Sequence, residues 1–157
     1  MQKITPFLWF DHQAEEAAQL YTAIFKNSKI NSINRTGAAE PGAEAAAMSV
    51  SFELEGLEFL ALNGGPYFTF TPAISLFVNC ETQEEVDILW GKLCEDGEEG
   101  QCGWLKDKFG LSWQIIPKGL VDMLYSKDAQ KSRRAMDAML QMKRIDIARI
   151  RQAFEQE

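Results

Sequence analysis

The chain contains few of the residues that usually build metal centres and covalent cross-links. Its 157 residues include one histidine and three cysteines. Cys80, Cys94 and Cys102 are odd in number and have no paired spacing, which argues against a disulfide framework. Reduced thiols are typical of the cytosol, so we expect a cytoplasmic protein.

Basic residues are fewer than acidic ones. Sixteen lysines and arginines stand against 23 aspartates and glutamates, which gives a formal net charge of −7. Nucleic acids and anionic membrane surfaces are bound by basic stripes or patches, so we expect neither as a partner. Basic residues do gather near the C-terminus, where we interpret them as the solvated face of helices: Lys131, Arg133, Arg134, Lys143, Arg144, Arg149 and Arg151.

Long apolar runs are missing as well. None approaches the roughly 18 residues that a membrane-spanning helix needs, and the first six residues lack the apolar segment of a signal peptide. The composition is that of a globular protein, with 46% hydrophobic and 25% charged residues. At this length we expect one domain, residues 1–157, with a substantial core.

The first half of the chain shows the pattern β-α-β-β-β. Pro6 in the first strand suggests the edge of a sheet or a barrel-opening position, and Asp11 is a candidate N-cap for the following helix. A loop at residues 36–44, rich in Gly, Ala and Pro, is expected to be disordered. One strand alternates cleanly, with Met48, Val50, Phe52 and Leu54 on one face. The expected elements are a strand at 3–10, a helix at 14–25 and strands at 29–35, 47–54 and 57–62.

The second half shows the same pattern, with a first strand at 73–79. Thr82 and Glu85 have the spacing of a capping box at the start of a helix that ends near Glu95. A short, poorly marked strand is expected near Glu99 or Gly100. The helix should bury Val86, Leu89, Trp90 and Leu93.

The stretch from 101 to 117 predicts a hairpin. Asp107 and Gly110 suit the first and fourth positions of a type I turn, and Trp104 and Trp113 are strong strand formers on either side. Residues 118–157 have helical spacing and are expected to form a C-terminal helical extension, with one helix at 128–142 and another beginning near Ile145. We therefore expect an α+β fold of two βαβββ modules, which form a curled mixed sheet around a cleft, plus C-terminal helices.

Several segments in this order resemble the PhnB-like branch of the vicinal oxygen chelate superfamily, the glyoxalase and bleomycin-resistance group. This branch is also known as 3-demethylubiquinone-9 3-methyltransferase-like. The segments that carry the resemblance are Phe7-Leu8-Trp9-Phe10-Asp11, Ala14-Glu15-Glu16-Ala17 with Tyr21, Asn63-Gly64-Gly65-Pro66, Cys102-Gly103-Trp104 with Asp107 and Gly110, Ser112-Trp113-Gln114-Ile115, and Met142-Lys143-Arg144-Ile145-Asp146-Ile147.

The resemblance implies a homodimer and a ligand cavity in the curled sheet. In many members of the superfamily a Glu on the last strand binds a metal, and Gln114 stands at the position that we match to it. A neutral amide is a poor ligand for Zn, Ni or Fe, and a catalytic zinc site usually needs three protein ligands. His12, the single histidine, is expected to be an exposed turn residue. We therefore expect no metal site of the family type and no cofactor.

Other residues are candidates for chemistry or ligand contact. Cys102 is the best candidate nucleophile, although its environment would have to lower the thiol pKa, and Gln114 is the other candidate catalytic residue. Asn63 could hydrogen-bond a ligand. Four aromatic side chains could line a cavity or pack in the core: Trp9, Phe77, Trp104 and Trp113.

The resulting hypothesis is a cytoplasmic homodimer that binds a small organic ligand. The leading form is non-catalytic binding or sequestration. An enzyme of the glyoxalase-like lyase, isomerase or dioxygenase class, metal-independent or with an atypically held metal, is the alternative, so whether the chain is an enzyme stays open. A structural dimer with an empty cleft is a third reading. Methyl transfer is disfavoured, because no glycine-rich loop follows the first strand.

Overall fold

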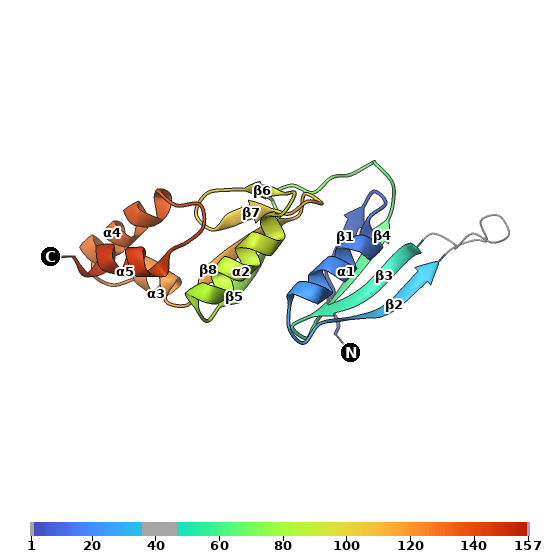
Figure 1. Ribbon diagram of the computed structural model, residues 1–157, viewed down its shortest axis with the longest axis horizontal. Helices are drawn as coiled ribbons and strands as arrows, with labels where there is room; N and C mark the ends of the chain where they lie inside the picture. The colour runs from blue at the N-terminus through green and yellow to red at the C-terminus, as the bar shows by residue number, and fades with distance from the viewer. Residues whose placement is uncertain (1, 36–46, 157) are drawn as a thin grey trace. The chain divides into compact units, whose positions relative to one another are not determined.

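The computed structural model describes residues 2–35 and 47–156 (Figure 1). These residues form eight strands and five helices, and the chain divides into two compact units, residues 1–70 and 71–157. Each unit holds one four-stranded mixed sheet, which confirms the expected α+β class and the two βαβββ modules. The expected loop at 36–44 lies outside the described residues, and the expectation of a single domain stays a prediction.

The first unit follows the predicted order. It comprises β1 (Phe7–Phe10), α1 (Ala14–Ile24), β2 (Lys29–Arg35), β3 (Ala47–Leu54) and β4 (Leu57–Asn63). The sheet order is β1-β4-β3-β2, with β1 parallel to β4 and the other pairs antiparallel. β1 is an edge strand, but it begins at Phe7, so it is shorter than the expected strand at 3–10 and Pro6 lies just before it.

One face of this sheet forms the core of the first unit with α1. Val50, Phe52 and Leu54 are buried as the alternation predicted, and Phe52 stacks on Phe59 of β4 with ring centroids 5.3 Å apart. Met48 is 48% exposed, so its expected burial is wrong. The register of β3 with β2 is irregular here: Asn34 pairs with Ser49 and Arg35 with Ala47, so Met48 is left without a partner on β2 and Ala47, at 7% exposure, is buried instead.

The start of α1 differs from the prediction. Its N-cap residue is Gln13, whose side chain makes no capping hydrogen bond to the helix. The assignment of Asp11 as N-cap is therefore wrong. Instead the Asn63 side-chain oxygen, at the end of β4, accepts a hydrogen bond from the Ala14 amide at 2.8 Å. A residue distant in sequence thus satisfies a free amide of the first helical turn.

The second unit repeats the topology of the first. It comprises β5 (Ser75–Cys80), α2 (Gln83–Cys94), β6 (Glu98–Glu99), β7 (Trp104–Lys106) and β8 (Ser112–Pro117), with sheet order β5-β8-β7-β6. The Thr82 hydroxyl accepts from the Glu85 amide at 3.1 Å, while the Glu85 carboxylate accepts from the Glu81 amide at 2.9 Å. The N-cap is confirmed, and the reciprocal bond lies one residue earlier than in the standard capping box.

The two faces of the second sheet have different environments. Leu105, Trp113 and Ile115 are buried on the face that α2 covers, at 2%, 2% and 0% exposure. The four helix residues predicted to be buried are buried against this face. Residues of the opposite face, such as Phe77 and Lys106, are exposed, so α2 leaves this face open.

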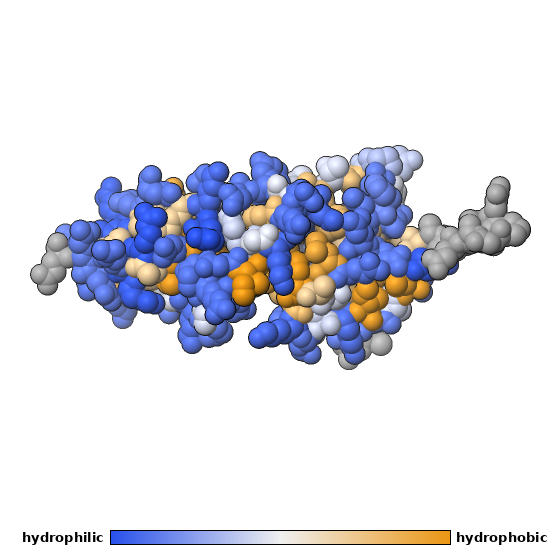
Figure 2. Space-filling view, in the orientation of Figure 1, coloured by the Kyte–Doolittle hydropathy of each residue, from blue (hydrophilic) through white to orange (hydrophobic). Residues whose placement is uncertain are grey.

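Three further helices follow the sheet: α3 (Leu120–Leu124), α4 (Ala129–Leu140) and α5 (Ile147–Glu155). Asp128 and Asp146 cap α4 and α5, so the second predicted helix begins two residues after Ile145. The helices share a cluster of buried residues, Ile116, Leu120, Met123, Ala135, Met142, Ile145 and Ile150. Their visible surface carries predominantly hydrophilic side chains (Figure 2). Arg133, Arg149 and Arg151 of these helices are exposed.

The helical extension is joined to the sheet by backbone hydrogen bonds. The amides of Cys102 and Gly103 donate to the carbonyls of Met142 and Lys143, both at 2.8 Å. Gly103 has φ +85°, and a Cβ there would lie 3.1 Å from the Ile145 side chain. Glycine therefore allows both the backbone conformation and the close approach of the extension. None of the helices in the described residues is long and apolar enough to cross a membrane.

Candidate functional site

Three predicted site residues form a row across the open face of the second sheet. Phe77 on β5 is the register partner of Gln114 on β8, and Gln114 is the register partner of Trp104 on β7. Residues directly opposite one another in neighbouring strands project to the same face. Phe77 is 47% exposed, and Gln114 and Trp104 are partly exposed. The row therefore places a phenyl ring, an amide and an indole side by side on an accessible surface.

A hydrogen bond orients the Gln114 amide within this row. Its nitrogen donates to the Ser75 hydroxyl of β5 at 2.9 Å. Its oxygen has no partner among the described residues. Because the nitrogen is engaged, the oxygen is the atom that Gln114 can offer to a hydrogen-bond donor on a ligand.

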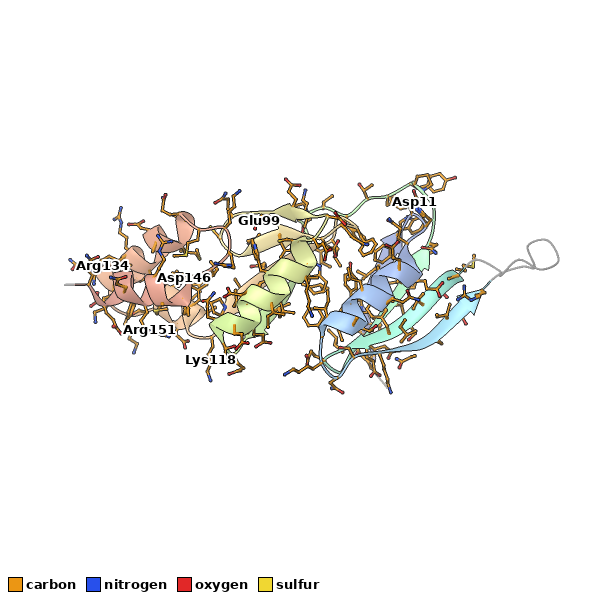
Figure 3. All side chains as sticks on the ribbon, in the orientation of Figure 1. Asp11, Glu99, Lys118, Arg134, Asp146 and Arg151 are labelled. Carbon is orange, nitrogen blue, oxygen red and sulfur yellow. The ribbon has the colours of Figure 1, made fainter. Side chains whose placement is uncertain are left out.

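Trp104 also borders a cavity of about 170 Å³ at the edge of the sheet. β6, β7 and the start of β8 line this cavity, with Glu98, Glu99, Lys106 and Ser112 among the lining residues. Figure 3 shows Glu99 beside β6 and α2, where its carboxylate accepts a hydrogen bond from the Trp90 indole at 2.8 Å. Neither a hydrogen bond nor a ring contact engages the Trp104 indole among the described residues.

Trp113 lies on the other face, in the core. It is 2% exposed, and its indole nitrogen donates to the Asp107 carboxylate at 2.9 Å. The structure thus separates Trp113 from the row that contains its sequence neighbour Gln114, because successive residues of a strand point to opposite faces.

The remaining two ligand candidates belong to the first unit. Trp9 lies on the sheet face opposite α1; its indole nitrogen donates to the Gly65 carbonyl at 3.0 Å and its ring meets Phe68 edge-on at 5.0 Å. Asn63 uses its amide for the fold: the oxygen accepts from Ala14, and the nitrogen donates to the Ala47 carbonyl at 2.8 Å.

Cys102 sits in the bend before β7 rather than in the row. It has φ 58°, is partly exposed and anchors the helical extension through its backbone amide.

The other two thiols, those of Cys80 and Cys94, have raised pKa values. Burial, followed by the Glu85 carboxylate, raises the pKa of Cys80 to about 12. Burial, followed by the Glu99 carboxylate, raises the pKa of Cys94 to about 11, so both thiols stay protonated at neutral pH.

The donors of the open face do not fit a metal site of the family type. Gln114 and Ser75 offer one amide oxygen and one hydroxyl, both weak ligands for Zn, Ni or Fe. Within residues 2–35 and 47–156, no three His, Cys, Asp or Glu side chains are grouped to hold a metal ion. His12 is an exposed turn residue, as predicted, with a side chain that is 76% accessible.

Three solved structures illustrate what this chain is similar to. A PhnB protein from Bacillus cereus is 43% identical, with a TM-score of 0.68, and the match covers 74% of this chain and 99% of that one. A Pseudomonas aeruginosa protein is 19% identical, with a TM-score of 0.62, and the match covers 74% and 98%. A glyoxylase/bleomycin resistance protein/dioxygenase domain from Frankia is 14% identical, with a TM-score of 0.48, and the match covers 76% and 95%. No curated protein gives a significant match.

The identity of 43% with the Bacillus cereus protein, over 99% of that protein, defines the class of this chain as PhnB-like. Residues 2–116 match the model of the 3-demethylubiquinone-9 3-methyltransferase family. The chain belongs to this family, the PhnB-like proteins. The family match ends within β8, so the helical extension lies outside it.

Sequence reasoning found Trp104 but missed the other residues that line the cavity. Ser112, Lys106 and Glu98 are register neighbours in one row beside the Gln114 row, across β8, β7 and β6. The sequence could have indicated Ser112, because Ser112 and Gln114 are two positions apart in the predicted hairpin strand and therefore lie on the same face. The position of β6, which brings Glu98 into the row, was too poorly marked in the sequence to complete it.

Proposed function

We propose that this PhnB-like protein binds a small organic molecule on the open face of its second sheet, without a metal ion of the family type and without turning the ligand over. The observation that carries the proposal is the row of Phe77, Gln114 and Trp104. Two aromatic rings flank one oriented amide, which is the common composition of small-molecule sites: apolar contact area plus a few placed polar groups.

The chemistry of the row supports binding rather than catalysis. An amide and two aromatic rings hold no nucleophile and no group that exchanges protons near neutral pH. Cys102 lies outside the row, and its backbone serves to attach the extension. The family name describes methyl transfer, but no glycine-rich loop follows β1 at residues 11–15.

The test is a small-molecule screen read by thermal shift, followed by titration of each hit. Gln114→Ala and Phe77→Ala should each weaken a hit by about tenfold, a magnitude ordinary for one lost ligand contact. Ile88→Ala is the matched control, because Ile88 is 48% exposed on α2, on the other side of the sheet. Equal weakening by the control variant, or formation of product from the bound ligand, would defeat the proposal.

Metal analysis separates this proposal from the atypical-metal alternative. Plasma mass spectrometry of untagged protein should find metal well below one ion per chain, and a chelator should leave the melting temperature unchanged. Near-stoichiometric metal that raises the melting temperature when restored would instead favour a glyoxalase-like or dioxygenase-like reaction.

We also propose a cytoplasmic homodimer without nucleic-acid or membrane partners. The net charge of −7 and the three free cysteines support the absence of these partners and a reducing compartment. Exposed apolar side chains such as Phe7 at 57% and Phe77 at 47% support association with a second copy. Light scattering should give twice the chain mass of 17.7 kDa; a monomer at micromolar concentration would contradict the dimer.

A further inference from the structure

The open face of the second sheet carries three successive rows of side chains along β8. Ser112, Gln114 and Ile116 belong to this face, because every second residue of a strand projects to the same side. The three positions span about 13 Å. Gln114 therefore lies in the middle, with one neighbouring row on each side of it.

The helical extension covers the row of Ile116. Ile116 is 6% exposed and belongs to the same cluster of buried residues as Met142, Ile145 and Ile150. Figure 1 shows α3, α4 and α5 gathered at the end of the second sheet where β8 finishes. Gln114, two positions earlier, is still partly exposed. The open face is thus closed off directly beyond Gln114.

The covering segment is held closely against the sheet. A Cβ at Gly103 would lie 3.0 Å from the Ile116 side chain and 3.1 Å from that of Ile145, so little space is left between strand and extension. The Gln83 side chain fixes the same segment, through bonds of 2.8 Å to the Ile145 carbonyl and 2.9 Å to the Ile147 amide. The extension therefore acts as a fixed wall.

This wall covers only one side of the Ile116 row. Asn79, the register partner of Ile116 on β5, stays exposed. On the other side of β8, just before β7, the amides of Cys102 and Gly103 are bonded to the extension. The wall therefore borders the part of the open face that holds Trp104.

The row on the other side of Gln114 leads to the cavity beside Trp104. Pro72, Trp104 and Ser112 are among the residues that line this cavity, and its surface is almost wholly apolar. The Ser112 hydroxyl is buried and is not offered to a ligand. An uncharged, apolar group fits such a surface, because a charged group would lose its hydration there without gaining a partner.

We propose that the helical extension limits the length of the ligand, with Ile116 as the residue that sets the limit. The ligand is small and uncharged. Its apolar end lies in the cavity beside Trp104, its hydrogen-bond donor meets the Gln114 oxygen, and the part beyond the donor stops at Ile116. The inference rests on the proposed function and deepens it, because it assigns the ligand a chemical class, a direction along β8 and a maximum length.

Two neutral probes test the wall, N-benzylacetamide and N-benzylbutanamide. Each has a ring for the cavity, an N–H donor for Gln114 and an acyl chain that points toward Ile116. The longer probe has more methylene groups, and burial of each would tighten binding by up to about fourfold. With the wall in place, the longer probe should bind no more tightly than the shorter one. Tighter binding of the longer probe to the original chain, or no binding of either at millimolar concentration, would overturn the inference.

Ile116→Ala should reverse the order of the two probes. It shortens the side chain that ends the site, so the longer acyl chain should then bind about fourfold or more tightly than the shorter one. Ile150→Ala is the matched control, because Ile150 is 0% exposed in the same cluster but lies on α5 rather than on the sheet. It should leave the order unchanged. An unchanged order in Ile116→Ala, or a reversal in both variants, would contradict the inference.

A second measurement needs no substitution. In NMR spectra of the original chain with labelled isoleucine methyl groups, N-benzylacetamide should shift the Ile116 signals together with the side-chain amide signal of Gln114. The Ile150 signals should stay in place. Binding that shifts Gln114 but leaves Ile116 fixed would show that the ligand does not reach the extension.

The same signals separate this inference from the proposed function. If hits from the screen shift the Gln114 amide signal while neither probe binds, the length limit is wrong and the binding function stands. If no ligand shifts the Gln114 signal, both are wrong.

Discussion

The Asp107 carboxylate lies beneath its own hairpin turn and accepts the indole N–H of Trp113 at 2.9 Å. It is 3% exposed and also accepts from the amides of Phe109 and Leu111, at 2.9 and 3.0 Å. One side chain thus closes the turn and fixes the core tryptophan. Trp113 lies in β8, which carries Gln114 on its other face. The bond between Asp107 and Trp113 therefore also helps to position the row of Phe77, Gln114 and Trp104.

Asp107→Ala should destabilise the protein by roughly 3 kcal/mol or more, because three donors, two of them buried, lose a charged acceptor. Asp107→Asn should cost less, since its oxygen can still serve the two amides. Urea denaturation measures both, with Asp137→Ala on the exposed surface of α4 as the control. A loss below 1 kcal/mol for the alanine variant would refute this role of the carboxylate.

Alanine substitutions at Gly64 and Gly91 are expected to have opposite effects on stability. A Cβ at Gly64 would collide with the Trp9 ring, whereas a Cβ at Gly91 in α2 meets nothing within 4 Å. Gly64→Ala should therefore cost about 1–3 kcal/mol by overpacking. Gly91→Ala should stabilise by about 0.5–1 kcal/mol through helix propensity. Thermal denaturation of both variants gives the comparison; effects of the same sign would contradict it.

Gln83 joins the helical extension to α2. Its amide donates to the Ile145 carbonyl at 2.8 Å and accepts from the Ile147 amide at 2.9 Å. Gln83→Ala should cost about 1–3 kcal/mol and speed hydrogen exchange at the start of α5. Gln130→Ala, on exposed α4, is the control. If exchange in α5 is the same in both variants, the bridge does not hold the extension.

Cys80 makes stability depend on alkaline pH. Burial, with the Glu85 carboxylate second, raises its pKa from the ordinary value of 9.0 to about 12. Above pH 9 the unfolded chain releases a proton that the folded chain keeps. Its contribution is therefore complete below pH 9 and is lost between pH 9 and about 12. Urea denaturation near pH 8 and near pH 10.5 should show a smaller decline for Cys80→Ala than for the original chain. Equal declines would contradict the assignment.

The features that could be predicted from sequence are those determined by residues close by in the chain. The capping residue Thr82, the turn from Asp107 to Gly110 and the alternation in β3 depend on residues within a few positions, and all appear in the structure. The wrong prediction for Met48 shows the limit of this reasoning, because periodicity assumes regular pairing and does not reveal the irregular register with β2 at this residue.

Contacts between distant segments could not be predicted. Asn63 caps α1 across 49 positions, and Gln83 reaches Ile145 across 62. The segments that carry the family resemblance make contacts with one another. The Trp9 ring packs on Gly64, and the Cys102 amide donates a hydrogen bond to the Met142 carbonyl. The family resemblance therefore indicates the fold more than it indicates a binding or catalytic activity. The row of Phe77, Gln114 and Trp104 depends on strand register, where a slip of one residue would send each side chain to the other face.

The most direct test of ligand binding on the open face uses the four tryptophans as probes. Fluorine-labelled tryptophan gives one ¹⁹F signal for each of Trp9, Trp90, Trp104 and Trp113, and Trp90 and Trp113 are only 4% and 2% exposed in the core. Titration with a hit from the screen should shift the Trp104 signal and leave those of Trp90 and Trp113 in place. Gln114→Ala should abolish the shift at the same ligand concentration. A ligand that binds while the Trp104 signal stays fixed would contradict the account.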